Sequence, residues 1–337
     1  PDMGISQSNG IYLSIATPLA GNLNFSAEGL YKYSYSKTGD ISNFTNIVDV
    51  DLFKLGGSWK TSSGLINLSA GRFFISDAAG AVFAQTSDGL YLNYSVSSVT
   101  FGMYAGYTGL LNSLNVSMAV PNTNTNEQFY NLSAGYIPLS AEVSYGALFG
   151  TDTIGLQVMY FLDPVQDLPS VLYGTVSLSG AVSTIGTYSV SATLGSVKFD
   201  NLMLYAKGDL IFFASDSVIA GAGIEYASGA QGSLSSFSTV TAKTACNYAG
   251  GYSLSGVLLP KLSASYTGNG LYANLTEKFV SLMPEDKINF NGFDTSVTVL
   301  YNIFSDLQIG LDLNAYFDIK DSDMNYYAGT VKASLTF

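Results

Sequence analysis

Apolar and polar residues alternate along most of this chain, and the C-terminal stretch 327–337 shows the pattern most clearly. One set of alternate positions holds Tyr327, Gly329, Val331, Ala333, Leu335 and Phe337. The other set holds Ala328, Thr330, Lys332, Ser334 and Thr336. Because successive side chains of a strand point to opposite faces, the pattern predicts a β-strand with one apolar and one polar face.

The same alternation recurs at 22–35, 139–148, 218–226 and 307–317, with the charged residues on the polar face. We predict about eighteen strands, each of the ~9–11 residues that cross a bilayer at a tilt, with sixteen as the alternative. Two regions decide the number. Residues 10–17 read as an extra strand before the regular series, and 228–256 is either one long loop or a weak strand at 237–245 flanked by loops.

Composition supports strands that face lipid. The chain has 337 residues, of which 47% are hydrophobic and only 11% are charged, against about 25% charged residues in soluble domains. No run of ~18 apolar residues predicts a spanning helix. Since only helices and closed barrels satisfy backbone polar groups in lipid, we predict an all-β fold: one closed antiparallel transmembrane β-barrel over residues 1–337. A soluble β-helix or large sandwich is the alternative.

The terminal strand, with Phe337 as its last residue, resembles those of bacterial outer-membrane β-barrel proteins. The resemblance implies an outer-membrane location, contact with outer-membrane lipid, and a role for Phe337 as the assembly signal read by the barrel-assembly machinery. The chain opens at Pro1 without a charged and then apolar leader, so we expect any signal peptide to have been removed.

Charge and residue usage exclude several functions. The net charge is −12, and Arg72 is the single arginine, which argues against a nucleic-acid partner. Cys246 is the single cysteine, so no intramolecular disulfide can form. The chain contains no histidine, so a serine nucleophile would lack its usual base. Asp49 and Asp51 could support glycoside hydrolysis, but a solvated acidic wall is favoured. We predict no catalysis, no cofactor and no metal site.

The polar faces supply candidate pore-lining residues. The acidic ones are Glu28, Asp49, Asp51, Glu142, Asp209, Glu225, Asp294 and Asp312, and the basic ones are Lys32, Lys207, Lys278 and Lys332. Acidic residues are in excess, and rings of carboxylates favour cations, so we predict a mildly cation-selective pore. Tyr272 is a candidate lumen-facing aromatic. Alternatively, the charges pair within the wall, as the short spacings of Glu28 with Lys32 and of Lys207 with Asp209 suggest.

Residues 71–94, with Gly71-Arg72-Phe73-Phe74 before a long loop and Asp88-Gly89 opening the next strand, resemble the strand, second loop and strand of bacterial porins. The resemblance implies that the third outer loop, 108–126, folds into the lumen as the constriction, with Gly109, Leu110, Asn115 and Asn122 as its candidate residues. It also implies a possible homotrimer. Porin constrictions oppose an arginine cluster to acids, and this chain departs from that pattern. The alternation of Arg72 with Ile66, Leu68 and Ala70 favours the lipid side for its side chain.

We therefore predict an outer-membrane porin, a passive diffusion channel for small hydrophilic solutes. The other outer loops are expected at 38–44, 76–87, 281–289 and 318–325. Two alternatives stay open. A hydrophobic-substrate transporter would need an N-terminal plug and an apolar lumen, and a surface adhesin or antigen would act through its outer loops, mainly 228–256.

Overall fold

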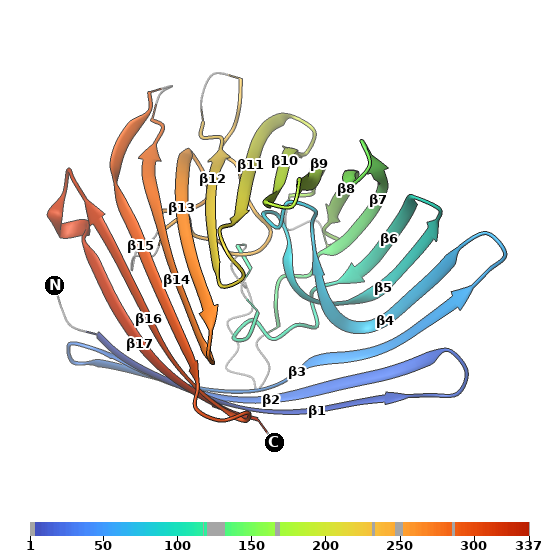
Figure 1. Ribbon diagram of the computed structural model, residues 1–337, viewed down its shortest axis with the longest axis horizontal. Helices are drawn as coiled ribbons and strands as arrows, with labels where there is room; N and C mark the ends of the chain where they lie inside the picture. The colour runs from blue at the N-terminus through green and yellow to red at the C-terminus, as the bar shows by residue number, and fades with distance from the viewer. Residues whose placement is uncertain are drawn as a thin grey trace. The chain divides into compact units, whose positions relative to one another are not determined.

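The structure is a computed structural model that describes residues 4–116, 118–119, 132–165, 169–230, 233–246, 252–284 and 287–336. This part of the chain forms seventeen strands and one short 3-10 helix, η1 (Ser322–Met324) (Figure 1). No helix in it is long and apolar enough to cross a membrane. The predicted all-β class is confirmed, and the seventeen described strands fall between the two predicted numbers.

The strands follow one another along the chain with few interruptions. The first eight are β1 (Gly4–Pro18), β2 (Leu23–Thr38), β3 (Ile41–Lys60), β4 (Leu65–Ser76), β5 (Ala84–Val96), β6 (Val99–Tyr107), β7 (Ile137–Leu148) and β8 (Asp152–Leu162). The others are β9 (Val171–Val182), β10 (Gly186–Val197), β11 (Asn201–Phe213), β12 (Val218–Ala227), β13 (Val257–Gly268), β14 (Leu271–Leu282), β15 (Asn289–Asn302), β16 (Leu307–Asp318) and β17 (Tyr326–Leu335).

The chain divides into two compact units. Unit 1 comprises Pro1–Gly146, Gly155–Gly174 and Thr239–Ala242, and unit 2 comprises Ala147–Ile154, Thr175–Ser238 and Lys243–Phe337. In unit 1, each strand from β1 to β6 pairs antiparallel with the next strand along the chain. In unit 2, the strands from β10 to β17 do the same. Each unit is thus a series of hairpins.

Short and long connections alternate over much of this series, as the sequence predicts, although 183–185, 198–200 and 214–217 are three short connections in succession. Residues 97–98 and 269–270 are tight turns, whereas 108–136 and 228–256 are long loops. One expectation needs correction. The predicted outer loop 38–44 is a turn at 39–40, because β2 and β3 stay paired up to Thr38–Ile41. Of the two alternatives for 228–256, the long loop agrees with the structure, because residues 237–245 form no strand and the described part of this loop makes only isolated bridges. Residues 10–17 lie in β1, as expected.

Towards the long loops, the polar face of several strands becomes apolar. In β11, Tyr205 shares its face with Lys207 and Asp209 but is fully buried, while Leu210 on the other face is exposed. Tyr205 stacks on Phe237 of the loop 228–256, with ring centroids 5.3 Å apart. Burying such side chains is favourable, so this loop folds back onto the sheet of unit 2.

Unit 1 has a comparable cluster beneath the loop 77–83. Phe83 is fully buried, and its ring centroid lies 5.4 Å from that of Phe161 on β8. The Phe161 ring also contacts Tyr136 and Tyr173. Asp77 fixes the loop, because its carboxylate accepts hydrogen bonds from four backbone N–H groups between residues 79 and 83. The predicted long loop at 76–87 is therefore shorter and packed.

Candidate functional site

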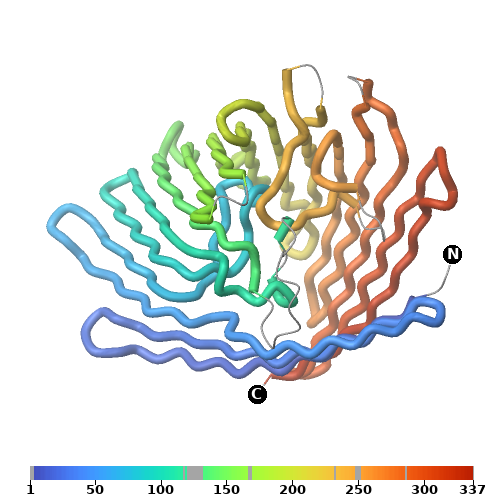
Figure 2. Tube along the Cα trace, turned by 180° about the vertical axis from the view of Figure 1, so that it is seen from behind, coloured from blue at the N-terminus to red at the C-terminus, as the bar shows by residue number. Residues whose placement is uncertain are grey.

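The candidate site of unit 1 lies where β3 and β4 part. Their ladder ends at the pair Phe53–Arg72, although β3 begins at Ile41 (Figures 1 and 2). Just beyond this pair β3 carries a bulge: Leu52 faces Glu28 and Val50 faces Gly29, which leaves Asp51 as the extra residue. Bulges bend a strand and increase its twist, so β3 turns away from β4 at Asp51.

Gly71 makes the corresponding irregularity on β4. Its φ is +113°, and a Cβ at this position would lie 2.1 Å from the carbonyl oxygen of Phe53, so only glycine fits. The conformation breaks the regular alternation just before Arg72. The lipid-side placement favoured by alternation is not what the structure has: the Arg72 side chain is 14% exposed and pairs with Asp49.

Arg72 joins three elements through one guanidinium group. Its Nε and Nη2 donate to the two carboxylate oxygens of Asp88 on β5, at 2.9 and 2.8 Å. Its Nη1 donates to Asp49 Oδ1 at 3.3 Å and to the carbonyl of Val50 at 3.1 Å, both on β3. Nη2 also donates to the carbonyl of Leu110 at 3.0 Å. Charge-assisted and bidentate bonds are the strong ones, so Arg72 binds the loop after β6 to the wall.

Asn115 makes a second attachment of the same loop. Its Nδ2 donates to Asp49 Oδ2 at 2.9 Å and to Asp51 Oδ1 at 2.6 Å. The two carboxylates predicted to share a face thus meet at one amide group. Asp49, Asp51 and Asp88 carry three negative charges against the single positive charge of Arg72, so this site has an acidic excess.

The loop has a frame of its own. The Asn112 side chain accepts from the N–H of Leu114, and its carbonyl accepts from Asn115 and Val116. At the base of the loop, Thr108 is fully buried and bonds to the backbone of Tyr136 on the returning side. Because side-chain oxygens close these turns, Asn115 is presented to the wall in a fixed orientation.

A further connection that the sequence did not reveal links three loops of unit 1. The carbonyl of Val82 accepts from the N–H of Val240 and Thr241, and the N–H of Ala119 donates to the carbonyl of Val240. Residues 239–242 thus dock between the loops that follow β4 and β6. The only sequence signal is the apolar character of Val240. Backbone bonds to loops far away in the chain leave no local pattern.

The predicted residue Glu142 also holds a loop in place. It accepts from Tyr91 Oη at 2.7 Å and from Gln157 Nε2 at 3.1 Å. Gln157 in turn accepts from the N–H of Ala78 in the loop after β4. Glycine at 102 makes room, because a Cβ there would lie 2.3 Å from Glu142 Oε1.

In unit 2, the predicted charges form a paired row across neighbouring strands. Asp209 lies between Lys207 Nζ at 3.4 Å and Lys261 Nζ at 2.6 Å. The ion pair of Asp209 with Lys261 lies over Gly223, where a Cβ would lie 2.5 Å from both Asp209 Oδ1 and Lys261 Cε. The remaining pairs are Lys278 with Asp294, Lys332 with Asp312, and Lys243 with Glu225.

The other predicted site residues are less connected. Tyr272 is exposed and Gly109 is buried. Among the described residues no ion pair joins Glu28 to Lys32, whereas the suggested pair of Lys207 with Asp209 is present. Asn122 and Phe337 lie outside the described residues. Sequence reasoning missed Arg72, Asp88, Lys243 and Lys261 as members of these clusters.

Comparison with known proteins shows which fold this chain shares. No protein-family model and no curated protein matches the chain. Solved structures do match. The Pseudomonas aeruginosa outer membrane protein opdK is 11% identical, with 97% of this chain and 92% of that chain covered and a TM-score of 0.64. This chain has the fold of that outer membrane protein. The porin-type fold predicted from the sequence is confirmed at this level.

Two further structures agree. P. aeruginosa OccK2 (OpdF), solved in complex with glucuronate, is 11% identical over 98% of this chain and 92% of that chain, with a TM-score of 0.64. Acinetobacter baumannii OccAB4 is 12% identical over 97% and 91%, with a TM-score of 0.58. At such low identity the residues of the site cannot be transferred, so their roles must be argued from this chain alone.

Proposed function

We propose that this chain is an outer-membrane porin whose strands close into one β-barrel and whose lumen is a passive diffusion channel for small hydrophilic solutes. The fold shared with the outer membrane protein opdK supports the location. Strands with one exposed apolar face support insertion in lipid: Leu210, Leu262 and Leu311 are exposed side chains of three strands of unit 2. The strand number of the closed barrel, the homotrimer and recognition by the assembly machinery stay predictions.

The observation that carries the proposal is the attachment of the loop 108–116 to the polar face of β3 by Arg72 and Asn115. A loop that were only a surface connection would need no such bonds to residues within the sheet. Placed on the lumen side of the barrel wall, the loop 108–116 narrows the cross-section of the channel and sets the size limit for solutes. Its attachment rests on charge-assisted hydrogen bonds to partly buried carboxylates.

Selectivity follows from the charge beside this loop. Asp49, Asp51 and Asp88 exceed Arg72, and Glu142 adds a further carboxylate in unit 1. In unit 2 the lysines are matched by acids at short distances. Carboxylates lining a confined passage raise the local concentration of cations, so we propose mild cation selectivity.

The alternatives gain no support. The described part of the loop 228–256 buries Phe237, Val240, Ala245, Cys246 and Leu254, so its apolar residues are used within the protein and do not form a free adhesive surface. A transporter for hydrophobic substrates would present a largely apolar lining beside the constriction. The loop 108–116 exposes Leu110 and Leu114, but the wall beside it carries the carboxylates of Asp49, Asp51 and Asp88. Diffusion of hydrophilic solutes needs no catalytic group, which agrees with the absence of histidine.

The test is conductance of the refolded full-length protein in a planar lipid bilayer under a KCl gradient. We expect stepwise openings and a reversal potential of the sign given by excess K⁺ flux. Insertion without openings would refute the diffusion channel. Openings with an anion-selective reversal potential would refute the proposed role of the carboxylates in selectivity, but not the diffusion channel.

A further inference from the structure

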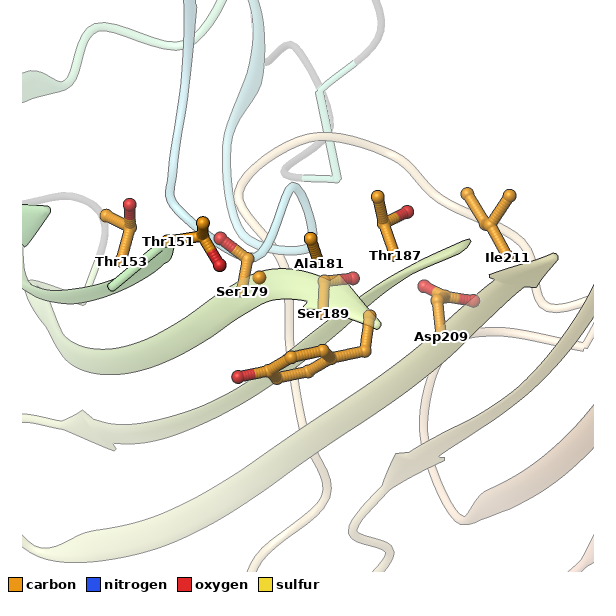
Figure 3. Close-up of a pocket in the computed structure, with 10 residues that line it drawn as sticks. Thr151, Thr153, Ser179, Ala181, Thr187, Ser189, Asp209 and Ile211 are labelled. Atoms are coloured by element: carbon orange, nitrogen blue, oxygen red, sulfur yellow. The ribbon is translucent and has the colours of Figure 1, made fainter. Parts of the chain in front are cut away.

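A groove on the polar face of unit 2 shares no residue with the site of Arg72. It measures about 360 Å³ and is lined by Thr151, Thr153, Ser179, Thr187, Ser189 and Asp209, with Ala181 and Ile211 between them. Figure 3 shows these side chains rising from neighbouring strands on the same side. The register agrees, because Ser189 pairs directly with Asp209 and Thr187 with Ile211.

The hydroxyl groups of this groove are available. Within the described residues, Thr153, Ser179, Thr187 and Ser189 have no hydrogen-bond partner for their hydroxyls. Thr151 makes one long contact, of 3.5 Å, to the carboxylate of Asp152. Each hydroxyl can donate one hydrogen bond and accept two. Several such groups in one groove match a ligand that itself carries many hydroxyls, because donors and acceptors can be exchanged at each position.

Asp209 adds a fixed acceptor. Lys261 contacts Oδ1 at 2.6 Å and Lys207 contacts Oδ2 at 3.4 Å, so the carboxylate is held in place and its charge is offset. A metal cation would gain little beside two ammonium groups, and a small anion would meet the carboxylate itself. The remaining lone pairs of Asp209 can still accept from the hydroxyls of a neutral ligand.

The size and the apolar residues complete the match. Ligand pockets commonly measure about 300–1,000 Å³, which makes this groove one for a small solute. Ala181 and Ile211 can contact the C–H groups of such a solute. We propose that the groove binds neutral polyhydroxylated solutes of the size of a monosaccharide or a sugar alcohol. Binding of a solute in this groove does not depend on passage of solutes through the proposed channel.

Saturation-transfer NMR with D-glucose and with sorbitol tests it, using the refolded full-length protein in micelles of an amine oxide detergent that contains no sugar. We expect saturation transfer to both solutes. The double variant Thr187→Val/Ser189→Ala removes two hydroxyls at nearly constant volume, and we expect about tenfold weaker binding. The matched control is Ser263→Ala/Ser265→Ala, which removes two hydroxyls from β13 outside the groove and should bind as the unaltered chain does.

Three results would overturn the proposal. One is no transfer to either solute by a protein whose circular dichroism shows the β-fold. Another is equal binding by both double variants, which would put the solutes elsewhere on the protein. Sodium acetate serves as the anionic probe, and acetate binding without glucose binding would also refute a site for neutral polyols. Bilayer conductance measured on the same preparation tests the channel separately, so failure of the binding site can be distinguished from failure of the channel.

Discussion

Arg72 and Asp88 form a two-pronged ion pair between β4 and β5, with Nε–Oδ1 and Nη2–Oδ2 distances of 2.9 and 2.8 Å. The two residues face each other directly in the ladder. This pairing orients the guanidinium plane so that its other N–H groups reach Asp49, Val50 and Leu110. The ion pair is therefore the frame for the loop attachment.

Replacing Arg72 tests that role. We expect Arg72→Lys to lower the free energy of unfolding by about 2 kcal/mol, because a lysine cannot make the paired bonds and leaves partly buried carboxylates unsatisfied. The loop loses its anchor, so single-channel conductance should rise. Denaturant unfolding and bilayer recordings measure the two effects. Lys60→Ala at the exposed end of β3 is the control, and unchanged conductance in Arg72→Lys would contradict the attachment.

Asn115→Asp would place a third carboxylate against Asp49 and Asp51. We expect like-charge repulsion to release the loop, which should raise conductance and shift the reversal potential towards greater cation selectivity. High salt should reduce the selectivity shift, because it screens the added charge. Asn201→Asp, at the exposed start of β11 in unit 2, adds the same charge to a residue that takes no part in the loop attachment. Equal changes in both variants would mean that charge alone is responsible.

Gly223→Ala tests the ion pair between Asp209 and Lys261. The new Cβ would lie 2.5 Å from atoms of both partners, so we expect the pair to separate and the free energy of unfolding to fall by about 0.5–1 kcal/mol, the typical contribution of a partly exposed ion pair. Gly208→Ala is the matched control on the neighbouring strand, since its Cβ would meet no atom closer than 3.8 Å. Similar losses in the two variants would show that glycine in the strand, and not the ion pair, matters.

Cys246 reports on the packing of the loop 228–256. Its side chain is buried, and this burial, with a smaller contribution from the charge of Asp294, raises the pKa of the thiol to about 12. We expect no labelling by a maleimide at pH 8 in the folded protein and complete labelling after unfolding. Ser236→Cys places an exposed thiol on the same loop as the control. Rapid labelling of Cys246 in the folded protein would show that the loop is open.

The raised pKa of the Cys246 thiol makes the stability of the folded protein depend on pH. The thiol pKa in the folded protein lies above its unfolded value of about 8.5. Its contribution to stability is therefore complete below pH 8.5 and is lost as the pH rises towards 12. Unfolding curves of the unaltered chain and of Cys246→Ala should converge over this range. Parallel curves would contradict the raised pKa.

Most of the strands and the fold class can be predicted from the local sequence. Alternation is a local property, because neighbouring residues of a strand must face opposite sides, so the strand at 327–335 and the extra strand at 10–17 are evident from their own residues. The charges of Asp209, Lys207 and Asp312 were placed on the polar face for the same reason. The absence of histidine and the scarcity of charge likewise narrowed the function without any structure.

Which of these residues come into contact depends on the folding of the whole chain. Arg72 and Leu110 touch because the glycine at 71 and the bulge at Asp51 redirect two strands, and neither effect can be inferred from alternation. Val240 reaches Val82 across almost half of the chain. Such contacts depend on where each loop closes and on the balance of burial against loop entropy. That balance is a property of the folded chain as a whole, and the local pattern does not contain it.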